Sequence, residues 1–158
     1  EEFRHIFELN DIYEDPTIYI NITSKKEKGD APEGCENWFT MINVPSNFDQ
    51  NWDELIPKFR EILKKKISRV LDVNLDEFIE TEEILDPVRI EEKTLSHRGS
   101  IYGAASNSNM AIFRRHPNST RRFKNLYFVG GSVHPGGGMP ICLNSAKIVG
   151  KMVKDVNG

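Results

Sequence analysis

Hydrophobic residues recur with a helical period between residues 51 and 70. They form one stripe, with most of the basic residues outside it: Trp52, Leu55, Ile56, Phe59, Leu63, Ile67 and Val70. This spacing predicts an amphipathic helix that buries one of its faces. Asn51 and Glu54 have the spacing of a capping box at its start. Pro57 predicts a kink or a first turn that begins later, because proline lacks the amide hydrogen that a helix interior uses.

Two segments of the first fifty residues have the pattern of strands. Residues 17–23 carry isoleucine at every second position, and residues 37–44 are rich in aromatic and β-branched residues before Pro45. Such alternation predicts a half-buried strand in the first segment, and the composition predicts a strand in the second. The polar stretch 24–34 between them is typical of a turn or a long hairpin loop. We therefore expect an antiparallel pair.

Four further elements follow along the chain. Residues 78–85 predict a short strand, and the Asp-Pro pair after them is typical of the N-cap and first position of a helix, here 87–95. Residues 96–125 are rich in loop-forming residues. The chain then predicts a strand at 126–129, a glycine-rich turn and a helix over about 140–156.

Composition excludes several classes of protein. The chain has 158 residues, of which 38% are hydrophobic and 28% charged, which suits one folded domain and not a disordered chain. No apolar run approaches the roughly 20 residues that a membrane-spanning helix needs. The opening EEFRHIF lacks the pattern of an export signal. Cys35 and Cys142 are too far apart for a disulfide framework or a CxxC site, and we expect a reducing, cytoplasmic compartment.

Charge is divided unevenly along the chain. Residues 1–92 contain 11 Lys and Arg against 23 Asp and Glu, a net charge of −12. Residues 93–154 contain 10 Lys and Arg and no carboxylate. A long stretch without carboxylates favours the binding of an anion, such as a phosphate, a nucleic acid or an acidic partner. Packing of the basic part against the acidic part is the alternative.

Five of the 11 glycines lie between residues 130 and 138, between the predicted last strand and last helix. A turn of this kind lets a ligand approach backbone N–H groups closely, because no Cβ intervenes. The N-terminus of the following helix adds a partial positive charge at the same place. The turn therefore predicts a site for an anionic or electron-rich ligand group, and a turn that serves only chain packing is the alternative.

Three known signatures do not fit this turn. The run Gly136-Gly137-Gly138-Met139-Pro140-Ile141 lacks the third glycine of the Rossmann fingerprint. His134 stands where the nucleophile elbow GxSxG needs glycine, and no histidine follows it. The GK[ST] end of a P-loop is missing. The turn is thus not a primary dinucleotide fingerprint.

Residues 125–147 (NLYFVGGSVHPGGGMPICLNSAK) resemble the C-terminal flavin-binding signature of the carotenoid (phytoene) desaturase family of FAD-dependent oxidoreductases. Residues 99–103 and 113–117 resemble that family's approach to the signature. Residues 16–21 and 31–34 resemble part of its substrate-domain sheet. The resemblance covers most of the chain, and residues 125–147 are its specific part.

The resemblance implies an α+β fold. Antiparallel substrate-domain strands with packed helices would occupy residues 1–95, and residues 96–158 would form the C-terminal part of the FAD-binding domain. The GxGxxG segment with which such enzymes bind the ADP half of FAD is absent from this sequence. We therefore expect a C-terminal part of a larger enzyme. Its partner would be the missing N-terminal part of the same polypeptide, and alone it would neither hold FAD tightly nor turn over.

By resemblance, the intact enzyme desaturates a carotenoid or another polyisoprenoid by passing hydride to flavin. No catalytic residue and no metal site are assigned. The first three residues of the turn would lie beside the ribityl and pyrophosphate groups, the middle would pass the flavin ring, and the helix start would face its pyrimidine edge. A side chain at Gly137 would occupy ligand space. The implied cofactor-binding residues are Gly130, Gly131, Ser132, His134, Pro135, Gly136, Gly137, Gly138, Met139, Pro140 and Ile141.

Other functions stay open at this point. The arginines at 114, 115, 121 and 122 suggest a phosphate or membrane-surface patch, hence peripheral membrane contact, or a solvated loop that pairs with the acidic part. An apolar polyene is the expected substrate. The alternative function is a non-catalytic anion- or nucleic-acid-binding module built on residues 93–154. That stretch lacks alternating aromatics and any nucleic-acid motif, so no nucleic acid is expected.

Overall fold

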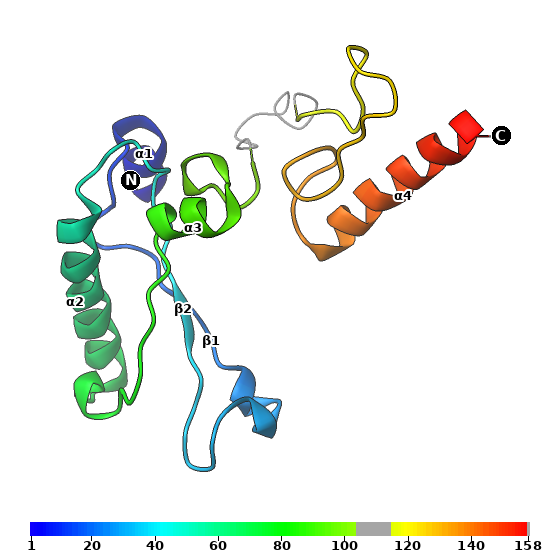
Figure 1. Cartoon of the computed structure of the whole chain (residues 1–158). Helices are drawn as coiled ribbons and strands as arrows, with labels where there is room; N and C mark the ends of the chain where they lie inside the picture. Colours follow the sequence, from blue (N-terminus) through cyan, green and yellow to red (C-terminus); the bar gives the residue numbers. More distant parts are fainter. Residues whose placement is uncertain (104–114, 158) are drawn as a thin grey trace. The chain divides into compact units, whose positions relative to one another are not determined.

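Helices and a two-stranded antiparallel sheet make up the regular structure of the described residues, 1–103 and 115–157 (Figure 1). The computed structural model divides the chain into two units with their own internal packing, Glu1–Asp86 and Pro87–Gly158. The expected boundary at residue 95 and the assignment to a substrate domain and an FAD-binding domain stay predictions. None of the helices in the described part is long and apolar enough to cross a membrane.

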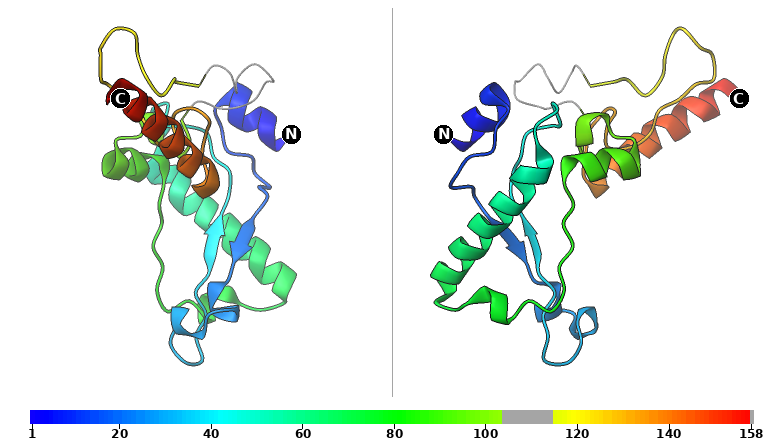
Figure 2. Two further views of the ribbon diagram at one scale, coloured as in Figure 1. Left: turned by 90° about the vertical axis from the view of Figure 1, so that its right-hand side faces the viewer. Right: turned by 60° about the vertical axis from the view of Figure 1, so that its left-hand side comes forward.

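The predicted strand pair forms, although both strands are shorter than expected. Strands β1 (Tyr19–Asn21) and β2 (Phe39–Met41) are antiparallel, with Ile20 opposite Thr40. Residues 23–30 form two short 3-10 turns at the far end of this hairpin (Figures 1 and 2). The hairpin is closed by side chains there, because Asn37 accepts a hydrogen bond from the amide of Ser24 at 2.9 Å.

The long helix α2 (Trp52–Leu71) forms where the apolar stripe predicts it, but Val70 at the end of that stripe is 73% exposed. Its buried residues are Trp52, Phe59 and Ile67. Asn51 stands at the N-cap, but its side chain makes no capping hydrogen bond, so the predicted capping box is wrong. Pro57 lies inside a helix that already begins at Trp52. The alternative prediction, that the helix begins only later because of Pro57, is therefore wrong. Burial of the apolar stripe outweighs the local cost of this proline.

Ion pairs join α2 to the segments around it. Lys66 donates to the carboxylate of Asp15 at 2.6 Å and to the carbonyl of Pro16 at 2.8 Å. Arg60 binds Glu82 through two nitrogens, with the shortest distance at 2.7 Å. The hydrogen bond from Lys66 lowers the pKa of Asp15, and the hydrogen bond to Glu82 raises the pKa of Arg60. These pairs fix chain segments that are far from α2 in sequence.

The strand predicted at residues 78–85 is wrong, because none of these residues is in a strand. A strand needs a neighbour with which its backbone can pair. Here Glu82 instead attaches the segment to Arg60 of α2 through side chains.

The second unit begins with the short helix α3 (Pro87–Thr94), which starts at Pro87 as predicted. Gly99 lies against the start of α3, and a Cβ there would come within 2.1 Å of the Pro87 carbonyl oxygen. Its φ of +68° is also one that favours glycine. Gly99 therefore permits the turn after α3 to pack on that helix.

Helix α4 (Met139–Asn157) closes the chain within one residue of its predicted bounds. Loops of residues 115–138 lie beside it (Figure 1). The strand predicted at 126–129 is wrong: these residues make an isolated antiparallel bridge between Tyr127 and Ser119 and no regular strand. An extended segment becomes a strand when neighbours pair along it, and within the described residues this pairing is limited to that bridge.

The first helical segment of the chain is also short. Helix α1 (Glu2–Arg4) continues directly into a π-helical turn, His5–Leu9. Glu2 accepts a hydrogen bond from the hydroxyl of Thr17 at 2.7 Å, and Ile6 is buried. This segment thereby covers part of the core of the first unit.

Candidate functional site

Two glycines of the turn have free space beside their backbone. Gly130 and Gly138 have φ of +129° and +94°, and no atom of the described residues lies within 4 Å of where a Cβ would stand. Gly138 immediately precedes α4, and its carbonyl accepts hydrogen bonds from the amides of Ile141 and Cys142 at 3.1 and 2.9 Å. Gly138 is exposed at this helix N-terminus, which suits an anionic ligand group. The amide of Gly130 is bonded to the Ser145 hydroxyl at 3.3 Å, so Gly130 offers free space beside its backbone but no free amide donor.

The other three glycines are packed against the chain itself. A Cβ at Gly137 would lie 2.2 Å from the ring of Tyr102, and one at Gly136 would lie 3.5 Å from the guanidinium of Arg115. A Cβ at Gly131 would come within 3.3 Å of the Sγ of Cys142. A side chain at Gly137 would therefore clash with Tyr102 first, and the expectation that it would also occupy ligand space stays a prediction.

Arg115 ties the turn to the segment before it. Its Nη1 donates to the carbonyl of Tyr102 at 2.8 Å and to the carbonyl of Gly131 at 3.0 Å. Arg121 and Arg122 are exposed, and a patch formed by these arginines stays a prediction. Arg114, the remaining arginine of that expectation, lies outside the described residues, as does Phe113 of the segment 113–117.

A buried polar pair holds both ends of the loop 128–134. Asn118 is 4% exposed and Ser145, on α4, is fully buried. The side-chain amide of Asn118 donates to the carbonyls of Phe128 (3.0 Å) and His134 (2.8 Å) and to the hydroxyl of Ser145 (2.9 Å). The Ser145 hydroxyl donates to the His134 carbonyl at 3.0 Å and accepts from the amide of Gly130 at 3.3 Å.

The backbone around this pair is bonded as well. The amide of Phe128 donates to the carbonyl of Asn118, and the amide of His134 donates to that of His116, both at 2.9 Å. The ring of His116 packs edge-on against Phe128, with 4.6 Å between ring centroids. The segments 116–118 and 128–134 and helix α4 are thus joined into one arrangement.

Sequence reasoning missed Asn118, Ser145 and Tyr102. Ser145 offered a signal, since it lies on the same helix face as the apolar Cys142, Val149 and Met152. A polar residue on an apolar stripe is expected to have a specific hydrogen-bond partner. Asn118 and Tyr102 lie in loops, where no periodicity marks a buried or packed side chain.

The remaining predicted residues lie mostly at the surface of this unit. The side chains of Ser132, His134 and Met139 are exposed, as are those of Pro140 and Ile141. His134 takes part in the loop through its backbone, and its bond to Pro135 is cis. Which of these residues meets a cofactor stays a prediction. Within the described residues, no three His, Cys, Asp or Glu side chains gather as metal ligands would.

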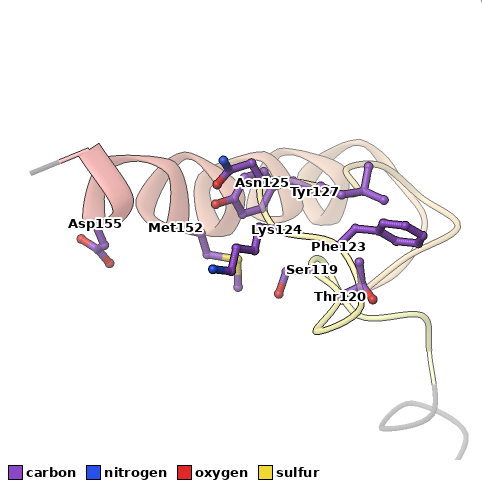
Figure 3. A pocket seen from close by; sticks show the side chains of 9 residues that line it. Ser119, Thr120, Phe123, Lys124, Asn125, Tyr127, Met152 and Asp155 are labelled. Carbon is purple, nitrogen blue, oxygen red and sulfur yellow. The ribbon is translucent and has the colours of Figure 1, made fainter.

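A pocket lies at the other end of α4. It has a volume of about 370 Å³ and is formed by the loop 119–127 together with Met152 and Asp155 of the last turns of the helix (Figure 3). Met152 is 13 residues from the helix start, which corresponds to about 20 Å along an α-helix. The pocket is therefore separate from the glycine-rich turn.

Comparison with known proteins gives clear relatives, although no family model matches the chain. It is 53% identical over 156 residues, 99% of its length, to a 1-hydroxycarotenoid 3,4-desaturase from Flavobacterium sp. (strain P99-3), of which the match covers 32%. It is 35% identical over 93% of its length to a 4,4'-diaponeurosporene oxygenase from Staphylococcus aureus (strain USA300), covering 30% of that protein. A 4,4'-diapolycopene oxygenase from Methylomonas sp is 35% identical over 99% of the chain and 32% of its own length.

The chain thus spans about a third of the length of these relatives. A match of this extent is compatible with the expected C-terminal part of a larger enzyme, which stays a prediction. The names of all three relatives refer to enzymes that modify carotenoids. The resemblance based on residues 125–147 is confirmed: the chain is a homologue of the carotenoid desaturases and oxygenases.

Proposed function

We propose that this chain is part of an oxidoreductase that modifies a carotenoid. The support is similarity along nearly the whole chain to three enzymes whose names state carotenoid desaturation or oxygenation. A non-catalytic anion-binding module on residues 93–154 is the competing function. Nothing in the names of the relatives supports that alternative.

The finer proposal is desaturation, in which two hydrogens leave adjacent carbons of an apolar polyene. In support, the relative with 53% identity is a desaturase by name, whereas the two oxygenases are 35% identical. The apolar side chains of Met139 and Leu143, 84% and 65% exposed, lie one helical turn apart at the start of α4. Such a surface suits a flavin ring or a polyene, both of which have large apolar faces.

We propose FAD as the cofactor and the glycine-rich turn as part of its site. The observation that carries this proposal is the free space beside the backbone of Gly130 and of Gly138, the second of which directly precedes the N-terminus of α4. Peptide groups that no Cβ covers can meet a ligand directly, and the helix N-terminus favours negative charge. The residues present therefore fit an anionic or electron-rich group such as those of FAD.

FAD would supply, when bound, the acceptor for the hydride that leaves the polyene. The chain's own residues would bind and orient the cofactor. Backbone groups around Gly130 and Gly138 would contact it, whereas Gly131, Gly136 and Gly137 would shape the turn from within. The absence of carboxylates from residues 93–154 keeps like charge away from an anionic ligand.

Peripheral membrane contact stays a prediction. Phe123 is 56% exposed, and the guanidinium of Arg122 lies 5.7 Å from its ring centroid. An exposed aromatic next to cations supports contact with an anionic lipid surface.

The reaction can be tested on the intact protein that contains this chain. We expect it to be purified with the visible absorbance of flavin. Anaerobic incubation with a carotenoid should bleach that absorbance and give a product that has lost two hydrogens by mass spectrometry. In a parallel incubation with air, a product with added oxygen would contradict desaturation, and absence of both flavin and carotenoid turnover would contradict the whole proposal.

The site can be tested with two variants. Gly130→Val should remove most of the flavin, because its side chain would enter the free space and a φ of +129° is strained for valine. His134→Ala should keep the flavin, because the hydrogen bonds of His134 that hold the loop come from its backbone. Gly29→Val, where a Cβ meets nothing within 4 Å, is the matched control. Flavin retained in Gly130→Val would contradict the site.

A further inference from the structure

We infer that Asn118 and Ser145 are positioning residues, which set the shape of the ligand site at the glycine-rich turn; this inference rests on the proposed function. Both side chains are polar, and they are 4% and 0% exposed. A polar group withdrawn from water is costly unless it is hydrogen-bonded. Their partners therefore show which part of the structure depends on them.

Those partners are concentrated in the loop that leads into the turn. Asn118 donates to the carbonyls of Phe128 and His134, at 3.0 and 2.8 Å. Ser145 contacts the same loop at the His134 carbonyl and at the amide of Gly130. The pair thus holds the loop where it begins and where it ends, and it bonds directly to one of the two glycines that face free space.

Regular secondary structure does not hold this loop. In residues 115–138 the described backbone pairing consists of isolated bridges, at His116 with Val133 and at Ser119 with Tyr127. Few backbone hydrogen bonds therefore oppose a change in the loop. Because side chains supply the missing bonds, their loss should alter the loop before it alters α4.

The Asn118 side-chain amide has two hydrogens for three acceptors, so one hydrogen is shared, whereas the Ser145 hydroxyl has a single hydrogen to donate. The hydroxyl oxygen of Ser145 accepts from the side-chain amide of Asn118 and the backbone amide of Gly130, so its own hydrogen is directed to the carbonyl of His134. Alanine at 145 leaves these three groups with fewer partners. Aspartate at 118 keeps the shape of asparagine but removes its two donors and places oxygen against two carbonyl oxygens.

The test compares Ser145→Ala and Asn118→Asp with Asn144→Ala in the intact protein. Asn144 is the exposed neighbour of Ser145 on α4 and is the matched control. Three quantities are measured: the dissociation constant of FAD, the visible spectrum of bound flavin, and hydrogen exchange of backbone amides. The exchange measurement needs no cofactor, so it tests whether Asn118 and Ser145 hold the loop 128–134 even if the proposed function is wrong.

We expect both variants to weaken FAD binding about tenfold, since loss of a buried hydrogen bond has this order of effect. Exchange should rise about tenfold at the amides of 128–134, with α2 unchanged and the spectrum of the remaining bound flavin shifted. Asn144→Ala should match the wild type in all three.

Exchange that rises equally throughout Pro87–Asn157 with an unshifted spectrum would overturn the inference, because the role would then be structural alone. Exchange at 128–134 and FAD affinity within about twofold of wild type would overturn it too. A wild-type protein without flavin whose variants still loosen 128–134 would instead contradict the proposed cofactor.

Discussion

Glycine serves two different purposes within nine residues of this chain. Gly130 and Gly138 have positive φ and free space beside them, whereas Gly137 is packed against Tyr102. The sequence shows five glycines close together and does not distinguish these cases. A substitution at a glycine beside free space should harm a ligand site, whereas a substitution at a glycine packed against a side chain should harm the packing of the fold.

Gly137→Ala should destabilise the second unit by about 1–3 kcal/mol, the usual cost of overpacking. Its Cβ would come within 2.2 Å of the Tyr102 ring and 3.0 Å of the Tyr102 Cβ. In a Tyr102→Ala background the same change should cost less, because the ring atoms are gone. Denaturant unfolding of the four proteins of this double-mutant cycle measures the coupling. Equal costs in both backgrounds would show that Tyr102 does not occupy this space.

For single residues, the sequence predicted the glycine-rich turn of the candidate site but not the side chains that hold and pack it. The turn at 130–138 and its glycines were evident from spacing. The hydrogen bonds of Asn118 and the packing of Tyr102 join segments that are distant in sequence, and no local pattern encodes such contacts. Ser145 could have been suspected from its position on an apolar stripe.

Helices of this protein were more predictable than strands. The apolar stripe of α2 and the Asp-Pro start of α3 depend on residues within one element, and both helices form where expected. The segments at 78–85 and 126–129 have strand-like composition but lack a partner along their length in the described residues. Strand formation depends on that partner, which the segment's own sequence does not specify.

Replacing Pro57 should make α2 more stable. Pro57 is exposed and lies inside the helix, where it cannot donate a backbone hydrogen bond. We expect Pro57→Ala to raise the free energy of unfolding by about 1–3 kcal/mol. Pro140→Ala is the control, because Pro140 lies in the first turn of α4, where amides have no partner within the helix. A gain at Pro140 as large as at Pro57 would count against this reason.

The ion pair that joins α2 to Asp15 should make a small contribution that disappears in acid. The hydrogen bond from Lys66 lowers the pKa of Asp15 from its ordinary value of 3.8. A carboxyl group with a lowered pKa stabilises the folded state above its unfolded pKa, and this stabilisation is lost as pH falls through the folded pKa. The stability difference between wild type and Asp15→Asn should therefore be full above the ordinary pKa of 3.8 and should be lost as the pH falls further, through the lower pKa of the folded state.

Unfolding curves over an acid pH series, at low and high salt, measure this difference. Salt should reduce it, because both partners are accessible to solvent. Glu33→Gln, an exposed carboxylate at the surface, is the control. A difference that grows as the pH falls would contradict the sign of this effect.

On the scale of the whole molecule, the chain spans about a third of the length of the enzymes it matches. Its sequence contains no GxGxxG segment, which by resemblance would bind much of the pyrophosphate of FAD. The 158-residue chain produced alone should therefore be colourless, whereas the intact protein should be yellow. Visible absorbance after purification with added FAD measures both. A stoichiometric flavin on the isolated chain would show that the turn and α4 suffice.

The position of Cys142 behind the glycine-rich turn has a practical consequence. Its sulfur lies against the backbone of Gly131, while Cys35, the other free thiol, belongs to the first unit. Cys142 is half-buried and the turn covers part of it, so we expect its alkylation to become faster when the turn moves aside. Ser145→Ala should accelerate alkylation of Cys142 and leave Cys35 unchanged as an internal reference, as followed by mass spectrometry over time. An equal acceleration of both thiols would indicate general unfolding. The ratio of the two alkylation rates thus reports loosening of the turn in an unlabelled chain, without a cofactor or a substrate.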